Sequence, residues 1–91
     1  DGVDGTWIGP ADLANSLALD VTTASGRQKH EDAIMRVLDA CHKTGKIPGI
    51  AGGINGERWL EKGFLYVTCA ADNAAINLTG KQTLEFLSQY R

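Results

Sequence analysis

The sequence has 91 residues, which is enough for one small domain and too few for two. Hydrophobic residues make up 43% of it and charged residues 22%, values typical of globular proteins, which excludes a disordered tail, a collagen-like repeat and a coiled coil. The formal net charge is −2 and no run of lysine or arginine occurs, so neither a nucleic acid nor a membrane is an expected partner.

The first half of the chain predicts a strand, a loop and a helix. Residues 3–8 contain Val, Thr, Trp and Ile and precede Gly9-Pro10, which predicts a strand that ends where proline cannot donate to a ladder. Residues 14–27 are rich in Ala, Thr, Ser and Asp and predict an extended loop, with one helical turn at residues 11–17. From Glu31 to Lys43, apolar residues recur at the spacing i, i+3, i+4, i+7, which predicts a helix with one buried stripe.

The second half predicts two further strands with a short helix between them. Residues 47–51 form a short apolar run after Gly45, a residue suited to the left-handed end of a helix. Residues 57–62 predict a short helix closed by glycine. Residues 64–69 are apolar almost throughout, which predicts a strand covered on both faces, as in a parallel sheet flanked by helices.

A last helix is predicted to start at Asp72 or Asn73. Its apolar side chains fall on one side: Ile76, Leu84, Leu87 and Tyr90. Gly80 lies within this segment and weakens the prediction of an unbroken helix.

Strands and helices alternate along the chain with short connections, which predicts an α/β fold with a parallel sheet. Three strands do not close a barrel, and an open three-stranded sheet would leave two edges and uncovered apolar surface. We therefore expect other chain segments or other copies to complete the sheet. In such folds the loops at the C-terminal ends of the strands carry function.

The junction Ile-Gly-Pro-Ala-Asp-Leu at residues 8–13 lies between the first strand and the helical turn after it. Gly9 permits a tight turn, and the backbone N–H groups from Ala11 onward form the first turn of a helix, where an anion is favoured. A carboxylate at Asp12 can hold a hard cation while these N–H groups hold a substrate carboxylate. On the residues alone, the simpler interpretation that Asp12 caps the helix is the favoured one.

The ordered set of motifs is more specific. The motifs are Asp-Gly-Val-Asp-Gly at residues 1–5, Trp-Ile-Gly-Pro-Ala-Asp-Leu at 7–13, Gly-Lys-Ile-Pro-Gly-Ile at 45–50, Gly-Phe-Leu-Tyr-Val at 63–67, and Asp72. Together they resemble the HpcH/HpaI aldolase family, the 4-hydroxy-2-oxo-acid aldolase type, whose relatives include macrophomate synthase. The resemblance spans nearly the whole chain, although the loop at residues 14–29 is several residues longer than usual.

This resemblance implies a (β/α)8 TIM barrel. Residues 1–91 would be the C-terminal segment of that single domain, with strands six to eight and their helices, and the N-terminal part would lie outside this chain. By the family pattern, Asp12 matches a ligand of a divalent metal, and Ala11 matches the residue whose N–H holds the pyruvate carboxylate. Ala51 matches a position that reaches the substrate pocket, although a plain packing role explains it equally well.

The family's other machinery is a metal-binding glutamate, an arginine, and a histidine and aspartate that act as base, and all of it lies upstream of this chain. We therefore assign no catalytic residue here and do not expect the chain to be active alone. The implied function is part of a class II aldolase, a lyase that uses Mg, Mn or Co and cleaves or forms carbon–carbon bonds of 2-oxo acids through a pyruvate enolate.

Two alternatives stay open. The chain could be a non-catalytic fragment or assembly module of the same scaffold, or part of a decarboxylating or acyl-CoA-lyase-like family member. The expected partners are a pyruvate-type 2-oxo acid, the N-terminal barrel segment, and further copies in a homo-oligomer, a trimer or hexamer. The helix at residues 73–90 is the expected interface.

Other polar and aromatic residues receive ordinary roles. His30 is expected just before a helix as a neighbour of its cap, and His42 near the end of that helix on the surface. Trp7 and Trp59 are expected to pack rather than to bind substrate.

Cys41 and Cys69 lack the paired spacing of a zinc site or a disulfide framework, so both are expected to be small buried hydrophobes in a reducing compartment. No apolar stretch approaches the roughly 18 residues of a membrane helix, and the first residues do not resemble a signal peptide. The expected location is the cytoplasm.

Overall fold

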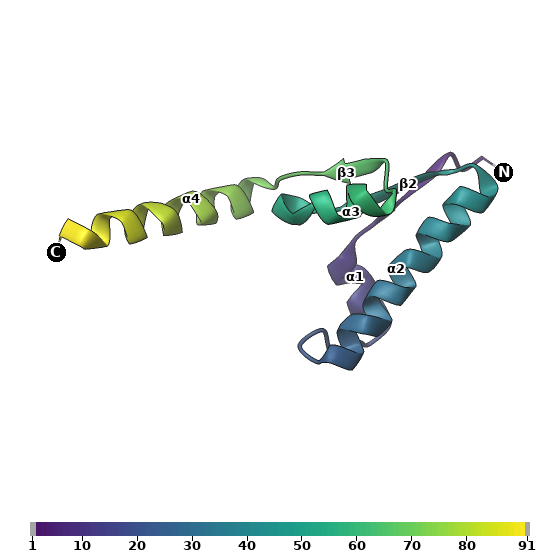
Figure 1. Ribbon diagram of the computed structural model, residues 1–91, viewed down its shortest axis with the longest axis horizontal. Helices are drawn as coiled ribbons and strands as arrows, with labels where there is room; N and C mark the ends of the chain where they lie inside the picture. Colours follow the sequence, from purple (N-terminus) through teal and green to yellow (C-terminus); the bar gives the residue numbers. More distant parts are fainter. Residues whose placement is uncertain (1, 91) are drawn as a thin grey trace.

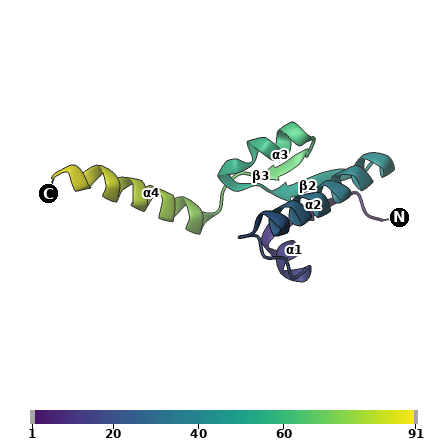
Figure 2. The ribbon, with the colours of Figure 1, turned by 60° about the horizontal axis from the view of Figure 1, so that its bottom comes forward.

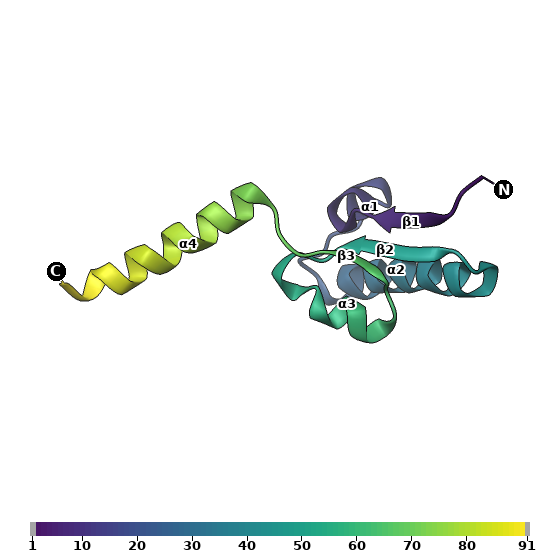
Figure 3. The ribbon, with the colours of Figure 1, turned by 90° about the horizontal axis from the view of Figure 1, so that it is seen from above.

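The computed structural model describes residues 2–90. Its centre is a parallel sheet of three strands, β1 (Gly5–Ile8), β2 (Ile47–Ala51) and β3 (Tyr66–Thr68), in the order β1-β2-β3. In Figure 3 the three strands lie side by side and all run toward the end of the molecule from which α4 extends. The predicted parallel α/β architecture is therefore confirmed, as an open three-stranded sheet.

The helices after β1 extend over more residues than the sequence predicted. After β1 the chain forms α1 (Pro10–Ser16), a short loop, and then α2 (Ala24–Thr44), which begins seven residues before the predicted start at Glu31. Thr23 is the N-cap of α2, and its hydroxyl accepts a hydrogen bond from the backbone N–H of Gly26 at 3.0 Å. The prediction of a loop as far as residue 27 was wrong because this cap lies inside a polar stretch that has no apolar periodicity.

The connection from β2 to β3 follows the sequence closely. β2 has the predicted bounds, and α3 (Glu57–Lys62) also begins and ends where predicted, after a short 3-10 turn, η1 (Gly53–Asn55). Gly45 and Gly63 end α2 and α3 with φ angles of 68° and 111°. Both lie in the left-handed region that glycine adopts without steric cost, so these two predicted helix ends are confirmed.

One hydrophobic core joins the sheet to α2 and α3. Its buried members come from β1, β2, the two helices and the connection between α3 and β3: Ile8, Ile34, Leu38, Ile50, Trp59 and Phe64. The rings of Trp59 and Phe64 meet edge to face with centroids 5.8 Å apart. The core therefore fixes α2 and α3 against one face of the sheet, an arrangement that can be followed in Figures 1 and 2.

The opposite face of the sheet is not covered by the described residues. Trp7, Gly49 and Tyr66 are aligned across the three strands, and Trp7 and Tyr66 are 53% and 60% exposed. β3 is also shorter than the predicted 64–69, and Leu65 is 73% exposed. The predicted burial of this run on both faces, and the predicted packing of Trp7, are therefore not observed, because helices cover one face only.

The last helix, α4 (Asp72–Leu87), continues into a 3-10 turn, η2 (Ser88–Tyr90), and starts at one of the two predicted residues. It passes through Gly80 without a break. None of its residues is buried, and it extends away from the sheet along the long axis of the molecule (Figures 1 and 3).

The cysteines differ from each other: Cys41 is buried as predicted, whereas Cys69 is exposed, because it follows the last strand at the open edge. No helix within residues 2–90 is long and apolar enough to cross a membrane.

Candidate functional site

The candidate site lies at the C-terminal edge of the sheet. Because the three strands are parallel, the segments that follow Ile8, Ala51 and Thr68 emerge at the same edge. These segments include the Gly9–Asp12 turn and the Gly52–Asn55 loop. The parallel register therefore brings together motifs that are about 40 residues apart in the sequence, as the sequence predicted.

Asp12 is the third residue of α1, and its side chain is exposed. The N-cap of α1 is Gly9, no side chain caps the helix, and among the described residues the Asp12 carboxylate makes no hydrogen bond or ion pair. The capping role that the residues alone favoured is therefore not observed. An exposed carboxylate without a partner can serve as an oxygen ligand of a hard divalent cation.

Gly9 makes room for that carboxylate. Its backbone is extended, with φ −91° and ψ 104°, a conformation open to any residue, so the predicted need for a special turn is not the reason for glycine. A Cβ atom at this position would instead lie 2.6 Å from Oδ2 of Asp12. Any side chain at residue 9 would therefore displace the Asp12 carboxylate.

The backbone N–H of Ala11 has no acceptor within the helix. Pro10 is the first residue of α1 and has no N–H, and the first intrahelical bond runs from Leu13 N–H to Gly9 O at 2.9 Å. The N–H groups of Ala11 and Asp12 precede this bond and are therefore unpaired within α1. Ala11 is also exposed, so its N–H is available to a ligand at the sheet edge.

Ala11 and Ala51 line the same cavity, which has a volume of about 640 Å³. Its other walls are the loop at 52–55, the segment at 68–71, and the first turns of α4 as far as Thr79. No charged residue lines this cavity, and Asp12 does not line it either. The structure thus brings two of the three predicted site residues into one cavity and places Asp12 on the turn beside it.

A second cavity, of about 480 Å³, lies between α1, α2 and α3. In its wall, Nε2 of His30 lies 2.7 Å from the carbonyl oxygen of Pro10. A carbonyl only accepts hydrogen bonds, so Nε2 carries the proton and donates it. His30 is half-buried within α2, not at its start, and the predicted role as a neighbour of the helix cap was wrong. The bond ties the turn that carries Ala11 and Asp12 to α2.

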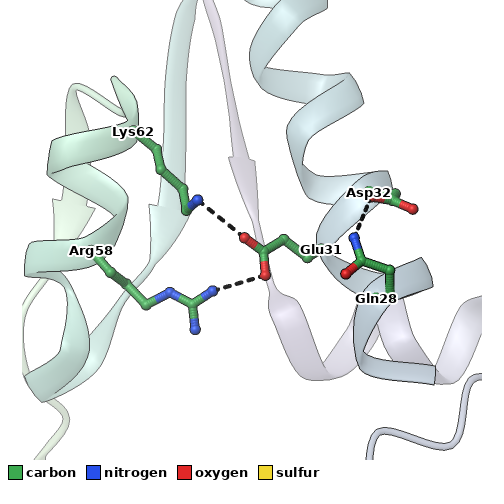
Figure 4. Close-up of polar contacts among 5 residues, drawn as sticks. All are labelled: Gln28, Glu31, Asp32, Arg58 and Lys62. Carbon is green, nitrogen blue, oxygen red and sulfur yellow. Dashed lines mark hydrogen bonds and ion pairs between the residues drawn. The ribbon is translucent and has the colours of Figure 1, made fainter. Parts of the chain in front are cut away.

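Glu31, the next residue, joins α2 to α3 (Figure 4). Its two carboxylate oxygens lie 3.2 Å from Nη2 of Arg58 and 3.1 Å from Nζ of Lys62. The hydrogen bond from Lys62, and the charges of Lys62 and Arg58, hold the pKa of Glu31 below its ordinary value. The Arg58 guanidinium also lies 4.4 Å from the centroid of the Trp59 ring. Because these charged side chains pair with each other, we assign them a structural role in packing α2 against α3.

Sequence reasoning missed both His30 and Glu31. The helix was predicted to begin at Glu31, so neither residue was expected to face a neighbouring element. The partner of His30 lies 20 residues away, and the two partners of Glu31, Arg58 and Lys62, lie 27 and 31 residues away, so these contacts became visible only in the fold.

Within the described part of the chain, no group of three or more His, Cys, Asp or Glu side chains is placed to hold a metal ion. Asp12 therefore belongs to no such group among the described residues. A complete metal site would need further ligands.

The chain is similar in sequence to several known aldolases. The hydroxypyruvate/pyruvate aldolase of Rhizorhabdus wittichii is 35% identical over 86 residues, which cover 92% of this chain and 34% of that aldolase. The 4-hydroxy-2-oxovalerate aldolase of Rhodococcus jostii is 32% identical, over 99% of the chain and 34% of the aldolase. The 4-hydroxy-2-oxo-heptane-1,7-dioate aldolase of Salmonella paratyphi B is 33% identical, over 84% and 29%.

The chain therefore spans about a third of the length of the curated relatives that it matches, in their C-terminal part. No family model and no solved structure matches it.

Proposed function

Since the chain is a relative of the HpcH-type 4-hydroxy-2-oxo acid aldolases over their C-terminal part, we propose that it supplies strands six to eight of a (β/α)8 barrel in a carbon–carbon lyase of 2-oxo acids. The observation that carries this proposal is the convergence of Ala11 and Ala51 on one cavity, with Asp12 beside it, at the C-terminal edge of a parallel sheet. Barrel enzymes carry their active sites at this edge.

In this proposal Asp12 is one ligand of a divalent cation, which would be Mg, Mn or Co. The side chain is exposed, is free of other partners in the described residues, and has room because residue 9 is glycine. The chemistry that such a cation supplies is Lewis-acid stabilisation of the negative charge that develops on the keto oxygen of a 2-oxo acid. The other ligands would come from the part of the barrel outside this chain.

The remaining roles are binding roles. The unpaired N–H of Ala11 would donate to the carboxylate of a pyruvate-type 2-oxo acid, and the small side chain of Ala51 would leave room for the rest of the substrate. No catalytic acid or base is assigned to this chain, so bond cleavage through a pyruvate enolate needs the N-terminal barrel segment.

We also propose that α4 packs against another copy in a homo-oligomer, a trimer or hexamer. The large apolar side chains of α4 and η2 are exposed in the described chain: Ile76, Leu78, Leu84, Phe86, Leu87 and Tyr90. Exposed apolar surface of this extent is typical of an interface.

The proposal is tested on the full-length protein. Pyruvate release from 4-hydroxy-2-oxo acids should depend on an added divalent cation and disappear with a chelator. We predict that Asp12→Ala abolishes this activity and lowers the affinity for Mn²⁺, because the loss of a ligand weakens metal binding and removes stabilisation of the developing charge.

Asp39→Ala is the matched control, because Asp39 is also an exposed helical carboxylate that makes no described contact, and it lies in α2 away from the sheet edge. It should leave both activity and Mn²⁺ affinity unchanged. Undiminished turnover and metal affinity in Asp12→Ala would contradict the assignment. A folded full-length protein without any metal-dependent activity would favour the non-catalytic alternative.

A further inference from the structure

His30 supplies the one side-chain hydrogen bond that α1 receives from another element in the described residues. Its Nε2 lies 2.7 Å from the carbonyl oxygen of Pro10, the first residue of α1. α1 has seven residues, of which Ala14 is buried and Leu13 is partly buried against the core. Because so little of this helix is packed, a hydrogen bond at its first residue has a large share in fixing how the first turn is oriented.

The donor is attached to a part of α2 that the core holds in place. His30, Ile34 and Leu38 recur every four residues and therefore lie along one side of the helix. Ile34 and Leu38 are each 1% exposed and belong to the core between α2 and the sheet. The ion pairs of Glu31 join the same turn of α2 to α3 (Figure 4). His30 is thus on a fixed support, and the turn of α1 is the part that it can position.

The acceptor of this bond belongs to the same peptide unit as the N–H of Ala11. The C=O of Pro10 and the N–H of Ala11 share one rigid plane, and because this peptide is trans they point in opposite directions. Pro10 and Ala11 line both cavities, whereas His30 lines only the cavity between α1, α2 and α3. The carbonyl therefore points toward His30, and the N–H points away from it, to the side of the cavity at the sheet edge.

We propose that His30 is a positioning residue: its hydrogen bond to Pro10 orients the Ala11 N–H for the carboxylate of a pyruvate-type 2-oxo acid. This inference rests on the proposed function, which gives that N–H its acceptor. Donation to the carbonyl oxygen also polarises the peptide unit, which makes its N–H a stronger donor. His30 acts from the far side of the peptide and does not itself touch the substrate.

Three substitutions of His30 separate the hydrogen bond from the volume of the ring. His30→Gln keeps an N–H donor at nearly the place of Nε2. His30→Asn is one methylene shorter, so its amide nitrogen lies near the place of Nδ1 and falls short of the carbonyl. His30→Leu has similar bulk and no donor. His42→Leu is the matched control, because His42 is an exposed residue at the other end of α2 with no described hydrogen bond.

The first measurement uses the metal-free full-length protein labelled with ¹⁵N-alanine. The backbone amide resonance of Ala11, identified by its loss in Ala11→Gly, should move in His30→Leu and His30→Asn and stay near its wild-type position in His30→Gln. An unmoved resonance in a folded His30→Leu protein would overturn the inference. If His30→Leu does not fold, the Asn and Gln variants make the same comparison. This result involves neither metal nor substrate and is therefore independent of the proposed function.

The second measurement is the affinity of the Mn²⁺-loaded full-length protein for pyruvate, by titration calorimetry. His30→Leu and His30→Asn should raise the Kd of pyruvate about 10-fold, because a hydrogen bond to a charged group is weakened. Their Kd for Mn²⁺ should stay within about 2-fold of wild type, since Asp12 is retained. His30→Gln and His42→Leu should bind pyruvate as the wild type does.

The outcomes separate the two proposals. A wild-type Kd of pyruvate in a folded His30→Leu protein, or a Kd raised as much in His30→Gln as in His30→Leu, would count against His30 and leave the proposed aldolase intact. A wild-type protein that binds neither Mn²⁺ nor pyruvate would overturn the proposed function, and with it the role of the Ala11 N–H.

Discussion

At the scale of single residues, two glycines are explained by the space that a neighbour needs. Gly9 leaves room for the Asp12 carboxylate, and Gly26 leaves room for a backbone carbonyl. Both have negative φ angles, so their conformations are open to other residues. Glycine at these positions is therefore a matter of packing, which differs from Gly45 and Gly63, where the left-handed backbone demands it.

Gly26 gives a stability prediction. It is buried in the first turn of α2, where a Cβ atom would overlap the carbonyl oxygen of Asp20. Gly26→Ala should lower the free energy of unfolding by about 1–3 kcal/mol, because the loop at 17–23 must move away. Ser25→Ala, at an exposed neighbouring position, should change it by less than about 0.5 kcal/mol. Chemical denaturation of both variants measures the difference, and equal stability would contradict this account of Gly26.

Glu31 gives a prediction on pH dependence. Its pKa is lowered in the folded state, chiefly by the hydrogen bond from Lys62, so its contribution to stability is present above the unfolded pKa of about 4.3. That contribution is lost as the pH falls through the lowered folded pKa. Because the side chains are partly exposed, the pair contributes about 1 kcal/mol or less.

Glu31→Gln should therefore be less stable than wild type at pH 7, and the difference should shrink below about pH 4. Urea denaturation across this pH range measures it. Glu61→Gln removes an exposed carboxylate of α3 that has no described ion pair, and it controls for the change in net charge. A difference that does not depend on pH would show that the ion pair is not its source.

At the scale of elements, the sequence predicted best where a glycine ends a helix. Residues 47–51 and 57–62 have the predicted bounds because Gly45 and Gly63 mark the helix ends beside them. The start of α2 was missed because its first turns are polar, so the apolar period that marks the rest of the helix is absent there. β3 was predicted too long because an apolar run shows that a segment can be buried, whereas its pairing partner decides where the strand ends.

The arrangement of the candidate site was also predicted only in part, because some of its contacts follow from the sheet topology and others from helix packing. A parallel sheet necessarily brings the ends of its strands to one edge, so the meeting of Ala11 and Ala51 followed from the predicted topology. The bond from His30 to Pro10 depends on how α1 packs against α2, which no local pattern encodes. The metal assignment of Asp12 stays a prediction, because the other ligands would lie outside this chain.

The exposed apolar side chains of α4 give a prediction for this element. In the proposed oligomer, Leu84→Glu would place a charge in an apolar interface and should shift the full-length protein toward the monomer. Gln82→Glu adds the same charge at a polar position of α4 and should leave the assembly unchanged. Sedimentation of both variants measures the mass. An intact oligomer in Leu84→Glu would contradict the interface.

At the scale of the whole molecule, helices cover only one face of the sheet in the described chain. α2 and α3 bury one face of the sheet, while Trp7 and Tyr66 on the other face stay half-exposed or more. In the proposed barrel this face would be the interior, where parallel strands are buried on both sides. The predicted burial of the apolar run at 64–69 on both faces would then be met in the completed barrel, although it is not met in the described chain alone.

The placement of α4 connects the proposed oligomer to the cavity at the sheet edge. Ala74, Leu78 and Thr79 of α4 form one wall of the cavity at the sheet edge, yet α4 has no buried residue to hold it against the sheet. In the proposed oligomer a neighbouring copy would hold α4, and therefore also that wall. Subunit association and the shape of this cavity would then be coupled by mass action, so that protein concentration would affect how the cavity binds a ligand.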